Sequence, residues 1–291
     1  MDVSDWPITG YGENSTLEKF ELLSPEGVPY VIKFPREFDQ KRTNWEDLNE
    51  IIAAKIASML GLKAVDAEIA YYGDRRACLM KHFAFQFGAD DRETVAALLI
   101  GQFGEEYKDI SDSSLSNLQR LEEFLSLFNQ FNYYPIVKEY FVHMNFFDIL
   151  IGNQDRHGHN WQLLFREGEP SPSPLYDNGA SLGWQLPDEK LLEYLSSPEK
   201  MHKLYKKTLL KVGLDNRETP KIKASSVIEY LITSYPSETK AFYEKLLSFD
   251  MEAFEVYCQA VPLISETRKK FLTHFIDYRK EQLLRKMEGG N

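Results

Sequence analysis

The sequence is poor in cysteine: only Cys78 and Cys258 occur among its 291 residues. The two lie far apart and fit no metal-binding or redox spacing. Folds that depend on disulfides are much richer in cysteine, and disulfides persist mainly in oxidising compartments. The scarcity therefore excludes a disulfide scaffold and favours a reducing, cytoplasmic location.

The sequence also lacks a long cluster of lysine and arginine, and its formal net charge is -11. Proteins that bind nucleic acids or acidic membranes usually present a basic face, because neutralised phosphates supply much of the affinity. We therefore expect no direct nucleic-acid partner, while a local basic cleft stays compatible with this charge.

Long apolar runs are missing as well. None approaches the roughly 20 residues that a membrane-spanning helix needs. The N-terminal segment MDVSDWPITGYG is acidic and has no apolar core, so it does not resemble a signal peptide. These absences predict a soluble protein without a membrane partner.

Material for a core is present, because 43% of the residues are hydrophobic and 13% are aromatic. Such a composition excludes a disordered chain. Near residue 85 the pattern changes from short strands with one helix to long helical stretches. We therefore predict an α+β fold of two lobes, a small mixed lobe over residues 1–85 and a large, mostly helical lobe over residues 86–291.

Hydrophobic periodicity and turn residues locate the elements. In the first lobe we expect an antiparallel sheet with strands at 19–23, 30–34, 68–72 and 77–80, the first two joined by a Ser-Pro-Glu-Gly turn. A helix is expected at 45–60, where an apolar stripe recurs at helical spacing: Leu48, Ile52, Ile56 and Leu60. In the second lobe we expect helices at 115–131 and 136–151, short strands at 161–165 and 175–176, an exposed turn at 168–174, and helices from 188 to a long last one at 265–287.

A polar loop, Gly-Asn-Gln-Asp-Arg-His-Gly-His-Asn, follows the apolar helix that ends near residue 151. It places Asp155 and Asn160 five positions apart, and Asp177 arrives seventeen positions later in Tyr-Asp-Asn-Gly. Phosphoryl transfer needs one carboxylate to orient the attacking hydroxyl group, and an amide and another carboxylate to hold a cation on the nucleotide phosphates. Hard cations such as Mg²⁺ take oxygen ligands of these kinds.

The first lobe offers groups for the phosphates. Lys33 lies in the strand Tyr-Val-Ile-Lys-Phe and shares a face with Val31, and a lysine in an apolar strand needs a partner. Glu50 and Glu46 lie one turn apart on the following helix, and periodicity alone does not choose between them. The preceding Gly-Tyr-Gly-Glu-Asn-Ser-Thr-Leu-Glu-Lys segment has backbone N–H groups that could cradle phosphates, although it matches no complete phosphate-loop motif.

Three segments together resemble the HipA-like serine/threonine kinases, which are related to the phosphatidylinositol kinases. They are the polar loop, the Leu-Tyr-Asp-Asn-Gly segment and the helix Asn-Glu-Ile-Ile-Ala-Ala-Lys-Ile-Ala-Ser-Met-Leu-Gly-Leu. The resemblance spans about residues 10–180 and implies a two-lobed, protein-kinase-like fold with ATP and Mg²⁺ as cofactors.

The resemblance also implies roles for individual residues. Asp155 would be the catalytic base, Asn160 and Asp177 the metal ligands, and His157 a structural member of the catalytic loop. Lys33 would contact ATP with Glu50 as its partner. The implied nucleotide loop contributes Gly12, Ser15, Thr16 and Lys19, and the implied hinge at adenine consists of Met80, Lys81, His82 and Phe83.

The implied activity is ATP-dependent phosphorylation of serine or threonine on a protein substrate. The chain begins close to the nucleotide loop and so is similar to the short, kinase-core forms of the family. Some family members are toxins with a small helix-turn-helix antitoxin, and an effector kinase is the other implied role. Some also autophosphorylate a loop serine, a part for which Ser15 or Thr16 is suited.

Other interpretations fit parts of the pattern. The chain could phosphorylate lipid or small-molecule hydroxyl groups, although the lack of a basic patch disfavours a lipid substrate. It could be a catalytically silent binding module, against which the full set of catalytic residues argues. His157 and His159 could bind a transition metal, but they lack a third nearby ligand and a helical spacing. Lys33 taken alone could be an edge-strand lysine that prevents aggregation.

Overall fold

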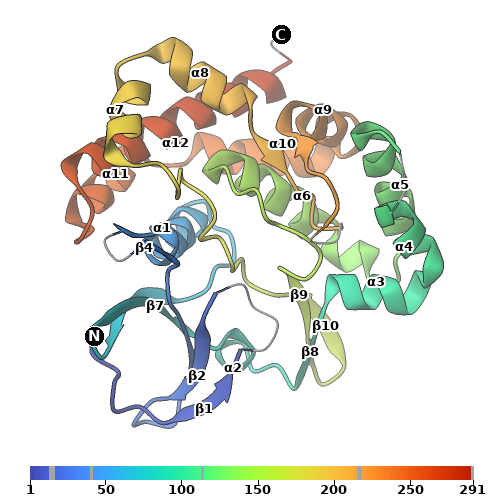
Figure 1. The fold of residues 1–291 in the computed structure, drawn as a ribbon. Helices are drawn as coiled ribbons and strands as arrows, with labels where there is room; N and C mark the ends of the chain where they lie inside the picture. The colour runs from blue at the N-terminus through green and yellow to red at the C-terminus, as the bar shows by residue number, and fades with distance from the viewer. Residues whose placement is uncertain (13–16, 40–41, 113–114, 215–217, 290–291) are drawn as a thin grey trace.

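The computed structural model describes residues 1–12, 17–39, 42–112, 115–214 and 218–289. Figure 1 shows a sheet-rich part formed by the N-terminal third of the chain and a larger helical part formed by the rest. The predicted α+β architecture, an antiparallel sheet followed by a mostly helical remainder, is therefore confirmed.

The N-terminal sheet has five antiparallel strands in the order β1-β2-β3-β7-β6. The strands are β1 (Ile8–Tyr11), β2 (Lys19–Leu23), β3 (Pro29–Lys33), β6 (Ala67–Tyr72) and β7 (Arg75–Lys81). The four predicted strands are all present, and β1 is added at one edge. Ile32 and Phe34 are buried in the small core of this sheet, whereas Val31 and Lys33 point to the opposite face and line a cleft. The alternation predicted for β3 is thus confirmed.

Helix α1 (Glu46–Met59) joins the two parts of the molecule. Its predicted stripe, which includes Leu48, Ile52 and Ile56, is fully buried in the large core of the helical part. Another face carries Ala54, which packs with Val65, Cys78 and Met80 beneath the sheet. One helix therefore contributes to the hydrophobic cores on both sides.

A second, three-stranded sheet borders the helical part in the order β10-β9-β8. Its strands are β8 (Asp91–Thr94), β9 (Gln162–Arg166) and β10 (Glu169–Pro172). The expectation of an exposed turn over 168–174 was wrong, because only Glu167 and Gly168 make the turn and the next residues pair with β9. Proline is tolerated there since β10 is an edge strand. The expected strand at 175–176 is reduced to a single bridge between Leu175 and Ala64.

The remaining elements are mainly helices, as the sequence predicted beyond residue 85. They are α2 (Phe83–Gln86), α3 (Val95–Phe103), α4 (Glu105–Asp112), α5 (Asn117–Asn129), α6 (Tyr134–Ile151), α7 (Asp188–Leu195), α8 (Pro198–Lys206), α9 (Ala224–Ser234), α10 (Pro236–Leu247), α11 (Met251–Ala260) and α12 (Glu266–Met287). Two short hairpins complete the set, β4 (Glu37–Asp39) with β5 (Arg42–Thr43) and β11 (Leu209–Leu210) with β12 (Ile222–Lys223). None of the helices within the described ranges combines the length and apolar character that a membrane crossing requires.

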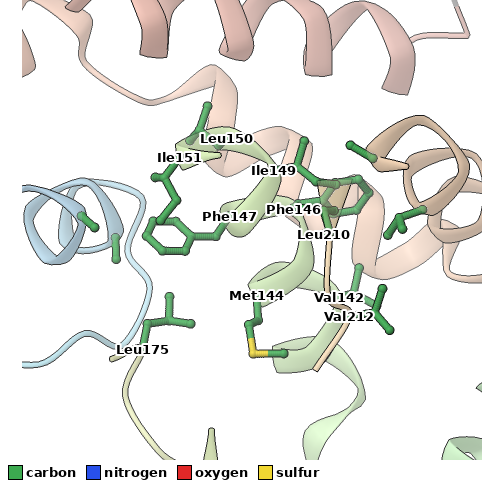
Figure 2. Close-up of a cluster of buried hydrophobic side chains, with 14 of the residues drawn as sticks. Val142, Met144, Phe146, Phe147, Ile149, Leu150, Ile151, Leu175, Leu210 and Val212 are labelled. Atoms are coloured by element: carbon green, nitrogen blue, oxygen red, sulfur yellow. The ribbon is translucent and has the colours of Figure 1, made fainter. Parts of the chain in front are cut away.

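Helix α6 forms the centre of the large core and positions the polar loop that follows it. Every residue from Phe141 to Ile151 is buried, including the three polar ones, His143, Asn145 and Asp148. Figure 2 shows Phe147 and Ile151 of this helix on the side facing Leu175. Gly152 then ends α6 in the left-handed conformation with φ of 68°, which glycine adopts without strain. The same core therefore fixes the start of the polar loop and the segment that leads to Asp177.

Candidate active site

A cleft of about 380 Å³ lies between the N-terminal sheet and the helical part. The described residues that line it come mainly from β2, β3, the end of β7 and the start of α2, β8, the polar loop with the start of β9, and the segment around Asp177. They are Gly12, Lys19, Phe20, Glu21, Val31, Lys33, Val65, Met80, Lys81, His82, Phe83, Arg92, Glu93, Thr94, His159, Asn160, Gln162, Tyr176 and Asp177. Most of the predicted nucleotide-contacting residues thus meet in one cavity.

Lys33 and Asp177 form the inner end of this cleft. The Lys33 Nζ donates to Asp177 Oδ1 at 2.9 Å. Burial opposes ionisation of Asp177, but the Lys33 ammonium outweighs it and lowers the pKa of Asp177 to about 2. Burial likewise opposes the charge of Lys33, while the carboxylates of Asp177 and Glu50 raise its pKa above the usual value. Both groups are therefore charged at neutral pH.

Asp155 lies in a smaller cavity that adjoins the cleft at this end. Lys33 and Asp177 line both cavities, and Asp155, Arg36 and Gly179 line the smaller one. Asp155 thus lines a cavity that shares Lys33 and Asp177 with the cleft.

The backbone at Asp177 adopts the left-handed conformation with φ of 60°. Aspartate tolerates this region better than most residues, but it remains uncommon and is concentrated at functional sites. The backbone N–H of the next residue, Asn178, donates to Glu50 Oε2 at 2.5 Å. Glu50 therefore fixes the position of the segment that carries Asp177.

The expected direct pairing of Lys33 with Glu50 is not formed in the structure. Glu50 instead accepts from Asn178, and Glu46 accepts from the backbone N–H of Arg36 at 3.2 Å. The left-handed turn at Asp177 brings its carboxylate to Lys33, so the lysine pairs across the cleft. Glu50 still acts on Lys33 electrostatically, because it contributes to the raised pKa of that lysine.

Sequence reasoning did not identify Arg156, which connects the polar loop to the segment around Asp177 through hydrogen bonds. Its fully buried guanidinium pairs with Asp148 at 2.9 Å and donates to the backbone carbonyls of Asn160 and Tyr176 at 2.8 and 2.5 Å. It also donates to the side-chain oxygen of Asn178. Asp148 in the middle of an apolar helix was the available signal, since a buried carboxylate requires a partner.

The oxygen atoms at the inner end fit a hard divalent cation. The Nδ2 of Asn160 donates to the backbone carbonyl of Asp155 at 2.8 Å, so the amide nitrogen is engaged and the side-chain oxygen is the atom that could coordinate a cation. Asp177 supplies a carboxylate in the same cleft. One carboxylate and one amide oxygen suit Mg²⁺, which keeps several of its waters.

A transition-metal site is not supported in the described part of the chain. There, no group of three or more histidine, cysteine, aspartate or glutamate side chains is arranged to hold a metal. His157 is buried and takes part in the turn of the polar loop: its N–H donates to the Asp155 carbonyl at 2.9 Å, and its carbonyl accepts from the Asn160 N–H at 2.8 Å. The structural role that the resemblance implies for His157 stays a prediction, and these backbone contacts are compatible with it.

The outer part of the cleft is an apolar slot. Val31, Val65 and Met80 form one side. The rings of Tyr176 and Phe83 stack with their centroids 5.0 Å apart and form another. A planar, aromatic ligand fits between surfaces of this kind. Sequence reasoning had not identified Tyr176, Val31 or Val65 as lining residues.

The expected hinge lies at the edge of this slot. The N–H of Lys81 donates to the Asp66 carbonyl at 3.1 Å, and the N–H of His82 donates to the Pro29 carbonyl at 3.0 Å. These two donors are therefore engaged within the protein. Phe83 begins α2, and an N–H in the first turn of a helix has no intrahelical acceptor.

Two lysines on neighbouring strands of the N-terminal sheet line the cleft. Lys19 and Lys33 are opposite in the register of β2 and β3. Burial, followed by repulsion from Lys33, lowers the pKa of Lys19. At Gly12 a Cβ atom would overlap the side chain of Lys19, so a larger residue there would force that lysine to move. Ser15 and Thr16, the other expected loop residues, lie outside the described residues.

The arrangement defines the class of a two-lobed kinase: a lysine on the third strand, a polar catalytic loop after a buried helix, and a carboxylate segment behind it. The profile of the HipA-like C-terminal domain matches residues 14–237. The chain therefore belongs to the HipA-like C-terminal domain family and is a HipA-like kinase, as the sequence motifs predicted.

Relatives of known structure share the fold. The chain is 25% identical over 269 residues to the serine/threonine-protein kinase CtkA of Helicobacter pylori, covering 88% of this chain and 77% of the relative. It aligns with the crystal structure of a Helicobacter pylori proinflammatory kinase CtkA over 99% of this chain and 97% of that one, with a TM-score of 0.77 and 21% identity. A Shewanella oneidensis HipA, solved with HipB and operator DNA, aligns over 98% of this chain and 66% of that one, with a TM-score of 0.55 and 15% identity.

Proposed function

We propose that the protein is an ATP-dependent serine/threonine protein kinase. The observation that carries the proposal is the inner end of the cleft, where Lys33, Asn160 and Asp177 line one cavity and Asp155 lines the next. A nucleotide whose aromatic base occupied the apolar slot would have its phosphates close to Lys19 and Lys33. The γ-phosphate would then lie at the boundary with the Asp155 cavity.

Positioning and charge account for catalysis in this scheme. Lys33 and Lys19 would neutralise phosphate oxygens, and Asn160 and Asp177 would hold Mg²⁺. When bound, Mg²⁺ neutralises charge on the phosphate oxygens during transfer. The Arg156 network keeps the backbones of Asn160 and Tyr176 at fixed positions, so the ligands need little reorganisation.

Asp155 would accept a hydrogen bond from the attacking hydroxyl group. It would take the proton as the new oxygen–phosphorus bond forms and the bond between the γ-phosphorus and the β-phosphate oxygen breaks, with ADP as the leaving group. Its backbone N–H is itself held by the side-chain oxygen of Asn153 at 3.2 Å. Asn153 in turn donates to Asp148 at 2.9 Å, so the loop is anchored to helix α6. The carboxylate is therefore presented on a rigid support.

The first test replaces the proposed base. We expect Asp155→Ala to bind ATP with unchanged affinity but to transfer phosphate at least about 100-fold more slowly, since general-base catalysis typically contributes 10²–10⁴-fold. Transfer from γ-labelled ATP to protein and an ATP-dependent thermal shift measure the two properties. Asp74→Ala, in the exposed turn between β6 and β7, is the matched control. Equal transfer by Asp155→Ala and the parent would refute the assignment.

A protein acceptor is inferred from the CtkA relative, which is named a serine/threonine-protein kinase. Mixed protein substrates and phosphoinositide vesicles offered in parallel would distinguish a protein kinase from a lipid kinase. Mass spectrometry of the reaction would identify phosphoserine or phosphothreonine and reveal whether Ser15 or Thr16 becomes modified. A thermal shift with ATP but no transfer to any acceptor would favour a silent binding module instead.

A small helix-turn-helix antitoxin is also proposed as a partner, because the HipA structure was solved together with HipB and operator DNA. This partner, rather than the acidic kinase chain, would supply the contacts to DNA. Co-purification of a tagged chain with the product of the neighbouring reading frame tests the proposal. Recovery of the chain without that product would argue for a kinase that acts alone.

A further inference from the structure

We propose that a groove beside the catalytic cavity binds the acceptor polypeptide and selects a basic side chain near the phosphorylated residue. This inference rests on the proposed protein kinase activity and concerns its substrate. The groove has a volume of about 810 Å³ and runs between the N-terminus of α1 and the segment that leads into α7. Figure 1 shows α7 and α11 on the same side of the molecule as α1 and β4.

The groove continues from the proposed site of transfer. Arg36 lines the cavity that contains Asp155, and its guanidinium lies 5.5 Å from the ring centroid of Trp184, which lines the groove. Glu46 of the Asp155 cavity is adjacent in sequence to Trp45, another lining residue. An extended chain whose hydroxyl group reaches Asp155 would therefore pass directly into this groove.

Two indole rings and two carboxylates give the groove its chemical character. Trp45 and Trp184 are partly exposed, and Asp188 and Glu189 at the start of α7 line the same surface. Neither carboxylate forms a salt bridge with any residue that the structure describes. Carboxylates and the faces of tryptophan rings both attract cations. A lysine or arginine side chain is the group that satisfies both.

A buried arginine behind the groove wall provides a separate observation. Arg268 is fully buried, stacks on Trp45 at 4.5 Å and donates to the Leu186 carbonyl at 2.5 Å. Its Nε and Nη1 have no hydrogen-bond acceptor in the described part of the protein. Both of its contacts line the groove, so these unpartnered N–H groups lie directly behind the groove wall. A main-chain carbonyl that displaces part of this wall would be the acceptor they lack. A polypeptide supplies carbonyls and basic side chains together, which a small cation does not.

The carboxylates could instead serve only to stabilise the N-terminus of α7, where negative charge is favourable. That role would change the thermal stability of a variant but not its choice of substrate. The test therefore compares substrates rather than stability alone.

The experiment uses the full chain and peptides with one serine, in which a single lysine is moved along both sides of the serine. Matched peptides carry glutamate or alanine at the same position. We expect at least one lysine position to lower the peptide KM about ten-fold relative to alanine, the size of effect that ion pairs and cation–π contacts of this kind provide. Glutamate at the same position should raise the peptide KM relative to alanine.

The double variant Asp188→Asn with Glu189→Gln should abolish the preference for lysine while leaving kcat and the KM for ATP within two-fold. The charge reversal Asp188→Lys with Glu189→Lys should transfer the preference to glutamate peptides. Glu252→Gln with Glu255→Gln on α11 removes the same charge elsewhere and should keep the lysine preference.

Two results would overturn the groove proposal while the kinase assignment stands: equal KM values for lysine and glutamate peptides, or an unchanged preference in the double variant. Anisotropy of a labelled lysine peptide measures binding without turnover. If no peptide or protein is phosphorylated, the proposed function fails. Peptide binding that is lost in the double variant would then still support the groove, and equal binding by both proteins would reject it.

Discussion

At the residue scale, the Lys33–Asp177 pair decides how the cleft responds to pH. The native pKa of Asp177, about 2, lies below the ordinary value of 3.8. The pair therefore stabilises the folded protein from the ordinary pKa of the carboxyl group up to the alkaline range in which lysine loses its charge. On the acid side this contribution is lost as pH falls from 3.8 toward 2. At neutral pH both partners are charged, so Asp177, the proposed cation ligand, needs no proton release to bind a metal.

We expect Lys33→Met to lower the melting temperature by an amount that stays constant between about pH 6 and 8 and shrinks below about pH 4.5, as Asp177 becomes protonated. Thermal melts of both proteins across this range measure the difference. Lys240→Met, an exposed position on α10, is the control for loss of a positive charge. A gap that widened on acidification would show that the pair does not govern the stability of this site.

At the scale of elements, the contact between the Asp177 segment and α1 is close. A Cβ atom at Gly179 would lie 2.7 Å from the backbone carbonyl of Glu46, so a side chain there would force the two elements apart. The position of Asp177, two residues away, depends on this contact. Glycine at 179 is therefore required by packing and not by backbone dihedral angles.

We expect Gly179→Ala to destabilise the protein by about 1–3 kcal/mol, as overpacking usually does. Transfer should slow as well, because the carboxylate of Asp177 moves relative to Lys33. Gly101→Ala in α3 is the matched control, since open space surrounds that glycine and alanine favours the helix. Chemical denaturation and phosphate transfer assays measure both effects. Equal behaviour of the two variants would mean that the segment relaxes without consequence.

The elements that sequence reasoning located are those with local signals. The strand β2, Lys19–Leu23, was predicted at its observed bounds because apolar residues end at a Ser-Pro-Glu-Gly turn. The stripe of α1 was evident from spacing alone. The strand β10 was missed because Pro170 and Pro172 indicate a turn, and only the position at a sheet edge makes them compatible with a strand.

The residues of the candidate site were recognisable from the sequence for a similar reason, but the contacts that these residues make with one another were not. Asp155, Asn160 and Asp177 are polar residues in short segments with a recognisable spacing. The partner of Lys33 depends on the left-handed backbone at Asp177, which no periodicity reveals. The role of Arg156 depends on four groups from three segments, so it is visible only once the chain is folded.

For the whole molecule, α1 determines how the proposed lobes, residues 1–85 and 86–291, behave together. The helix belongs to the first segment of the chain, yet Leu48, Ile52 and Ile56 are buried in the core of the second. Separating the lobes would expose this stripe, at about 1.5–3 kcal/mol for each large side chain. The two lobes should therefore unfold together.

Two tryptophans report on the two cores, Trp6 beside the sheet core and Trp161 inside the large core. In variants that retain only one of them, with phenylalanine at the other tryptophan positions, we expect thermal fluorescence transitions with the same midpoint, as cooperative unfolding requires. Helical circular dichroism provides the common reference. An earlier transition at Trp6 would show that the sheet lobe melts independently.

The shared burial of α1 also bears on how nucleotide enters. In this protein the helix beside the cleft is held by both cores, and Glu50 on it is fixed by Asn178. A ligand can thus occupy the slot without a swing of the helix or of one lobe. Crystals grown without nucleotide should accordingly accept ATP analogues by soaking, without cracking and with unchanged cell dimensions.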